Sequence, residues 1–200
     1  MPSAASITRI VAMGDSTTAG TPAFKSPVEA PPNGRGDQTS QYAYWLRRSH
    51  PEWEVLNRGV NGERSDQIRG RFERDVVAAA PKAVVIIAGV NDVYQGRPFE
   101  HVTKELSAMY ARAAQAGIRV VAGSIIPYNT ATPEQNARMR EINDWIRHQP
   151  GIVFVDTRAA AAAAGNPDRL LDSPDGLHPT PAVYHRMADA IRPALEQVLR

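Results

Sequence analysis

Short runs of consecutive apolar residues recur along the whole chain and constrain its fold more than any other feature. In two of them, Val84–Ile87 and Ile152–Val155, every position is apolar. A strand of this kind is buried on both faces, which is typical of a parallel sheet covered by helices. We therefore predict five strands, at Ile7–Met13, Trp53–Asn57, Ala83–Ala88, Ile118–Gly123 and Ile152–Val155.

Helical patterns separate these runs. Helices are predicted over Gln38–Ser49, Ser65–Ala79 and Phe99–Ala116, from Thr132 onward, and from Thr180 toward Leu199. Thr132, Pro133 and Gln135 have the spacing of a capping box with proline at the first helical position. Pro193 is expected to bend or break the last helix, because proline cannot donate the helical hydrogen bond. Strands and helices alternate, which predicts an α/β sandwich around a parallel sheet.

The 200 residues suffice for one domain with a sizeable core, so we predict a single domain over residues 1–200. Thr21–Asp37 is rich in proline and glycine and is interpreted as an insertion, which we expect to wall the pocket at the end of the first strand or to contact a neighbouring subunit beside that pocket. A mobile loop without a role is the alternative. Ala159–Ala164 is predicted to be helical and to carry no chemistry.

Composition excludes several classes of function. The chain has no cysteine, which excludes a thiolate nucleophile, a disulfide framework and cysteine-bound zinc. No apolar run approaches the roughly 20 residues of a membrane span. The net charge is only +2 and basic residues alternate with acidic ones, so no nucleic-acid partner is expected. Met1–Ser6 lacks the features of a signal peptide. We expect a cytoplasmic protein if Met1 is the native start, and a secreted one if a signal peptide was removed.

Polar residues and glycines follow the predicted strands, where functional groups of open α/β sheets gather. Ser16 follows the first strand, Gly59 the second and Asn91 the third, and Asp175 and His178 lie in the loop before the last helix. Taken singly, each has a structural interpretation: the serine caps a helix, the glycine and the asparagine belong to turns, and the histidine is a surface residue.

Taken together, these residues satisfy the needs of acyl transfer. Ser16 supplies a hydroxyl nucleophile, and His178 a base with an ordinary pKa of about 6.5. A turn would place the carboxylate of Asp175 against the far ring nitrogen of that histidine. The backbone amides of Ser16 and Gly59 and the side-chain amide of Asn91 are candidates to bind the oxyanion.

The motifs in this order resemble those of the SGNH hydrolases, also called GDSL esterases and lipases. The matching blocks are Gly14–Ser16, Gly59 within Asn57–Gly62, Gly89–Asp92 and Asp175–His178. The resemblance implies a flavodoxin-like three-layer sandwich with a five-stranded parallel sheet and a Ser16, Asp175 and His178 triad. It also implies that Ser16, Gly59 and Asn91 form the oxyanion hole. Thr17 replaces the leucine of the family name, as in some members that act on acetylated carbohydrates.

A serine esterase acting on a small-molecule ester is therefore expected. Three alternatives stay open: an acyltransferase with the same acyl-enzyme, a flavin- or phosphate-binding module using Ser16–Thr18, and a non-catalytic sugar binder. No metal or other cofactor is expected, because no His, Asp and Glu residues have metal-ligand spacing. The acyl length, the alcohol and the oligomeric state are not predicted. Rival acids are Asp172 and Asp156, and the remaining histidines are His50, His101, His148 and His185.

Overall fold

A five-stranded parallel sheet forms the centre of the protein, of which the computed structural model describes residues 7–200. The strand order is β4-β1-β5-β6-β7. The strand bounds are β1 Thr8–Gly14, β4 Trp53–Gly59, β5 Ala83–Ile87, β6 Arg119–Gly123 and β7 Ile152–Val155. All five predicted strands are confirmed, whereas the expectation for Met1–Ser6 lies outside the described residues.

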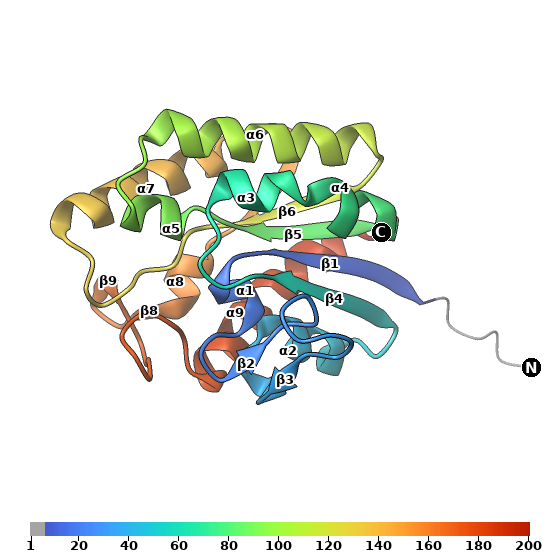
Figure 1. The fold of residues 1–200 in the computed structure, drawn as a ribbon, viewed down its shortest axis with the longest axis horizontal. Helices are drawn as coiled ribbons and strands as arrows, with labels where there is room; N and C mark the ends of the chain where they lie inside the picture. Colours follow the sequence, from blue (N-terminus) through green and yellow to red (C-terminus); the bar gives the residue numbers. More distant parts are fainter. Residues whose placement is uncertain (1–6) are drawn as a thin grey trace, which may run out of the picture.

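Helices cover both faces of the sheet (Figure 1). One face packs against α3 (Ser65–Gly70), α4 (Phe72–Asp75), α6 (Phe99–Gln115) and α7 (Pro133–Arg147), and the other against α2 (Tyr42–Ser49), α8 (Thr157–Ala161) and α9 (Pro181–Val198). The central strand β5 contributes Val84 and Ile86 to one core and Val85 and Ile87 to the other. The consecutive apolar positions are thus explained by burial on both faces, and the predicted α/β sandwich is confirmed. Within residues 7–200, no helix combines the length and the apolar character of a membrane span.

The helix predicted over Ser65–Ala79 is broken, and a buried arginine accounts for the break. The segment divides into α3, α4 and the 3-10 helix η2 (Val77–Ala79). Arg71 leaves the helical conformation at φ −108° and ψ 8°. Its buried guanidinium pairs with Glu63 at 2.6 Å and Asp75 at 2.8 Å, and donates to the carbonyl of Gly14 at 2.9 Å. These contacts outweigh the local helical preference.

Three other predictions about helices need correction. Gln38–Ser49 divides into η1 (Gln38–Ser40) and α2, because Gln41 between them is extended. In the alanine run, α8 ends at Ala161, and the next two residues form β8 (Ala162–Ala163), which pairs with β9 (Asn166–Leu170). The last helix, α9, continues through Pro193, so the expected break does not occur, whereas the expected bend stays a prediction. The one-turn helices α1 (Ser16–Ala19) and α5 (Val90–Tyr94) were not predicted.

The insertion at 21–37 is folded. Its strands β2 (Phe24–Lys25) and β3 (Arg35–Gly36) form an antiparallel pair. The hydroxyl of Ser26 donates to the carbonyl of Gly59, which fixes the insertion to the carboxyl end of β4. The segment is therefore folded, with a small sheet of its own that is anchored to the edge strand β4.

Two glycines let α1 pack directly against the ends of β1 and β4. Gly14 and Gly59 are partners in the sheet register. A Cβ atom at Gly59 would lie 2.1 Å from the Ala19 nitrogen, and one at Gly14 would lie 2.3 Å from the Thr18 hydroxyl oxygen. Neither site has room for a side chain. Glycine at both positions therefore allows α1 to begin immediately after β1.

This close packing predicts that Gly59→Ala destabilises the protein. The added methyl group would push α1 off the sheet, and overpacking of this kind costs about 1–3 kcal/mol of unfolding free energy. Gly70→Ala is the matched control, because nothing lies within 4 Å of its Cβ position. Denaturant unfolding of both variants measures the difference. Equal unfolding free energies would contradict the packing argument.

Candidate active site

Ser16 lies at the carboxyl end of a central strand. Strand β1 ends at Gly14, and Asp15 caps α1 by accepting a hydrogen bond from the Thr17 amide at 2.9 Å. Ser16 is therefore the first residue of α1, and it is 5% exposed. The abrupt change from strand to helix places its side chain at the sheet edge, where functional groups of such folds gather.

A tight turn holds Asp175 and His178 together. One carboxylate oxygen of Asp175 accepts the amides of Leu177 at 2.9 Å and His178 at 2.8 Å. Gly176 supplies the positive φ of +77° that the turn requires, and its carbonyl accepts the Asn129 amide at 2.7 Å. The loop is thus fixed both internally and against the segment that follows β6.

These elements bring three predicted residues into one hydrogen-bonded chain. The Nε2 atom of His178 lies 3.0 Å from the Ser16 hydroxyl oxygen, and its Nδ1 atom lies 2.7 Å from the second carboxylate oxygen of Asp175. Burial alone would raise the pKa of Asp175, but hydrogen bonds from the His178 ring and the two turn amides outweigh it and lower the pKa. The carboxylate is therefore ionised at neutral pH and can orient the imidazole.

A cavity of about 220 Å³ opens beside this chain. It is lined by Ser16, Thr17, Asn61, Val90, Asn91, Tyr94, Ile126, Tyr128, Leu177 and His178. Asn91, in α5, donates one side-chain N–H to the carbonyl of Glu63 at 2.9 Å. Its second N–H has no acceptor among residues 7–200, so the structure places this predicted residue at the cavity with one donor free for a ligand.

The structure contradicts the assignment of Gly59 as an oxyanion donor. Its amide donates to the side-chain oxygen of Asn57 at 2.9 Å, and its Cα packs against Ala19. Strand β4 runs two residues beyond the prediction, so this glycine still belongs to the strand.

The following turn contains Asn61, which lines the cavity, and Gly62. Gly62 has φ +77°, and within residues 7–200 its amide donates to no protein acceptor. Sequence reasoning missed this second glycine of the same motif.

The rival residues have other partners. Asp156 caps α8 by accepting the Ala159 amide at 3.0 Å and also pairs with Arg147, and His178 contacts Asp175 rather than Asp172. The other histidines are held elsewhere: His50 between Glu52 and Glu196, His185 stacked on Trp45, His148 beside Asp144, and His101 beside Asp66 and Asp92.

Asp66, Asp92 and His101 offer ligand atoms within 4.8 Å of one another, a grouping that their spacing in the sequence did not reveal. Asp92 already accepts the amide and the hydroxyl of Ser65, each at 2.8 Å. Asp66 forms a two-point ion pair with Arg64. The arrangement therefore holds the start of α3 against α5, and a cation would have to displace Arg64.

The insertion does not wall the cavity beside Ser16, and its expected contact with a neighbouring subunit stays a prediction. None of the residues 21–37, all of which the structure describes, lines the cavity beside Ser16. The segment lines a different cavity, because it packs against the outer edge of β4 rather than across the mouth of the site.

Comparison with known proteins shows a single family. A model described as the GDSL-like lipase/acylhydrolase family matches residues 12–186. An acetylxylan esterase from Geobacillus stearothermophilus is 28% identical in an alignment of length 133, which covers 58% of this chain and 60% of that protein. The matched region thus spans about three fifths of the curated relative.

Solved structures share the fold. A lipolytic protein of the G-D-S-L family from Desulfitobacterium hafniense superposes with a TM-score of 0.78 at 23% identity, covering 94% of this chain and 99% of that one. The psychrotrophic esterase EstA from Pseudoalteromonas gives 0.74 at 18%, covering 96% and 98%. The acetylxylan esterase Axe2 from G. stearothermophilus gives 0.70 at 22%, covering 96% and 94%.

The contacts of His178 predict unequal effects for the two loop carboxylates. Asp175→Asn removes the ionised acceptor on Nδ1 and should lower ester turnover by about 10²- to 10⁴-fold. Asp172→Asn, the matched control in the same loop, should leave turnover nearly unchanged. Initial rates with a p-nitrophenyl ester measure both, and the opposite ranking would exclude Asp175.

The buried carboxyl group of Asp15, the residue before Ser16, predicts an unusual pH dependence of stability. Burial raises its pKa from 3.8 to about 7 despite hydrogen bonds from Thr17, and the charge of Asp92 adds to the rise. Between these two values the folded state keeps a proton that the unfolded state releases, so this group's contribution to stability falls as pH rises through the window. The asparagine side chain of Asp15→Asn does not titrate, so this pH-dependent loss of stability is absent from the variant.

The unfolding free energy of Asp15→Asn relative to the parent protein should therefore increase from about pH 4 to about pH 7, by on the order of a few kcal/mol. Denaturant titrations at a series of pH values measure it. Parallel pH profiles for the two proteins would show that Asp15 is ionised in the folded state.

Proposed function

The chain belongs to the GDSL-like lipase/acylhydrolase family, and from this premise we propose that it hydrolyses short-chain carboxylic esters through an acyl-enzyme on Ser16. Membership confirms the resemblance to SGNH hydrolases drawn from the four motifs and makes the chain a carboxylic ester hydrolase. Family membership also argues against the alternative of a flavin- or phosphate-binding module. The observation that carries the mechanism is the chain of contacts from Ser16 through His178 to Asp175, at 3.0 Å and 2.7 Å.

In the proposed reaction, the Ser16 hydroxyl attacks the ester carbonyl while Nε2 of His178 takes its proton. Asp175 holds the imidazole with Nδ1 protonated and stabilises the imidazolium. His178 then protonates the departing alkoxide, which leaves the acyl group on Ser16. Water, activated by the same nitrogen, releases the acid and restores the serine.

Three donors are proposed to bind the oxyanion that forms in each step. The Ser16 amide lies at the start of α1, where helical N–H groups lack intrahelical partners. The free N–H of Asn91 is the second, and the Gly62 amide replaces that of Gly59 as the third. Such donors act on charge that develops in the transition state, and each is typically worth about 10²–10³ in turnover.

The size and lining of the cavity favour an ester with a small acyl group and a ring-shaped alcohol portion. At about 220 Å³ it is smaller than sites for drug-sized ligands, which start at about 300 Å³. Tyr94 at its rim is 61% exposed and offers a flat face to a sugar ring. Together with Thr17 and the similarity to an acetylxylan esterase, this supports acetyl esters of carbohydrates as substrates. Acyl transfer to an alcohol other than water uses the same intermediate and is the second candidate.

The proposal predicts rates across a panel of p-nitrophenyl esters and acetylated xylose oligomers. Acetyl esters should react faster than long-chain esters, because the cavity is small.

Ser16→Ala should lower every rate by about 10⁴-fold or more while the protein stays folded. A phosphonate inhibitor should label Ser16 alone. Labelling of another serine would refute the mechanism, and transfer products formed with added alcohol would identify an acyltransferase.

A further inference from the structure

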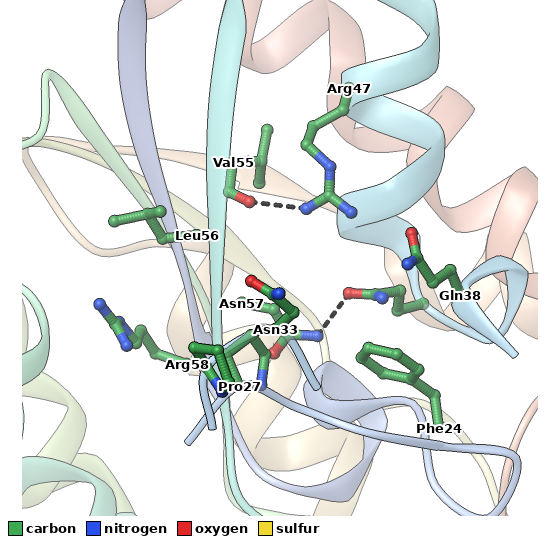
Figure 2. Close-up of a pocket in the computed structure, with 11 residues that line it drawn as sticks. Phe24, Pro27, Asn33, Gln38, Arg47, Val55, Leu56, Asn57 and Arg58 are labelled. Atoms are coloured by element: carbon green, nitrogen blue, oxygen red, sulfur yellow. Dashed lines mark hydrogen bonds between the residues drawn. The ribbon is translucent and has the colours of Figure 1, made fainter. Parts of the chain in front are cut away.

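A second cavity, of about 480 Å³, lies at the free edge of β4 and is walled by the insertion (Figure 2). Its lining residues come from the insertion, η1, the connecting residue Gln41, α2 and β4, and they include Phe24, Gln38 and Arg47. Ser16, Asn91 and His178 line the other cavity. This space is therefore separate from the candidate active site and has no role in the proposed reaction.

The lining has positive charge and no acidic residue. Arg47 reaches from α2 toward β4 and donates to the carbonyl of Val55 at 2.8 Å (Figure 2). Within residues 7–200, no carboxylate lies within 4.0 Å of its guanidinium nitrogens. Arg58 also lines the cavity, but its side chain points to the opposite side of the strand. Arg47 thus presents an unneutralised, partly buried cation with donors to spare.

A buried amide adds a second unused donor group. The Gln41 side chain is 1% exposed, and its oxygen accepts from Asn57 at 2.7 Å. Its Nε2 atom has no protein acceptor among the described residues, although it belongs to a cavity-lining side chain. This N–H group is not enclosed by protein atoms, so it can donate to a ligand in the cavity that accepts hydrogen bonds.

The opposite wall is apolar, with Phe24 and the rings of Pro27 and Pro32. We propose that this cavity binds a small organic acid, with its carboxylate on Arg47 and the Gln41 amide and its apolar portion against Phe24. A planar guanidinium matches a carboxylate with paired hydrogen bonds, and the volume suits a single-ring ligand. Burial lowers the pKa of Arg47, as expected for a desolvated cation without a counter-charge.

Calorimetric titration of the full chain with benzoate, glucuronate, benzamide and inorganic phosphate tests the proposal. Both carboxylates should bind with one-to-one stoichiometry, and neutral benzamide should bind at least about tenfold more weakly, because it cannot form the charged hydrogen bonds. Prior labelling of Ser16 with a phosphonate should leave the binding unchanged. The binding measurement does not require ester hydrolysis, so its result is independent of whether the proposed function is correct.

Three variants locate the ligand. Arg47→Gln should weaken benzoate binding by about tenfold or more. Gln38→Glu, an exposed position on the same wall, should weaken it by placing negative charge at the cavity, and it decides the question if Arg47→Gln does not fold. Arg48→Gln, the exposed neighbour on α2, is the matched control and should bind normally.

Four results would overturn the assignment. In the first, neither carboxylate binds at millimolar concentration, and in the second, the folded cavity variants bind as tightly as the parent. In the third, only phosphate binds, and in the fourth, binding is lost when Ser16 is labelled. The last result would place the ligand in the catalytic cavity instead.

Discussion

The direct packing of α1 on the ends of β1 and β4 is the constraint on which the rest of the site depends. Gly14 and Gly59 leave no room for a side chain, so the helix begins as soon as the strand ends. The Asn57 amide then donates to the carbonyls of Thr18 at 2.9 Å and Ala19 at 3.2 Å. This fixes Ser16 relative to the sheet, and every distance to the His178 loop presupposes that position.

Two carboxylates near Ser16 have opposite environments. Asp15 is buried beneath α1, where desolvation raises its pKa to about 7. Asp175 lies in a partly exposed turn, where the His178 ring and backbone amides lower its pKa. Different surroundings thus suit the first to a structural cap and the second to orienting a base that becomes positively charged.

Two cavities of the protein differ in their chemistry. The space beside Ser16 is small and is lined by both apolar and hydrogen-bonding side chains. The larger space across β4 carries an unneutralised arginine and is shaped by the insertion. Asn57 lies between them, because its amide contacts both Gln41 and α1. The insertion therefore builds a surface that the family motifs do not include.

The sequence by itself determined the five strands, because burial on both faces leaves a local pattern of consecutive apolar residues. It also predicted Ser16, Asn91, Asp175 and His178 as site residues, through motifs at strand ends and in the last loop, and the structure brings these residues together. Only the tertiary structure decided the rest. The helix breaks where the Arg71 side chain finds buried partners, and the insertion packs where β4 leaves an open edge. Gly59 is excluded as a donor because Asn57 takes its amide. Such outcomes depend on contacts between distant segments, which no local pattern records; the 3.0 Å approach of Ser16 and His178 spans 162 residues.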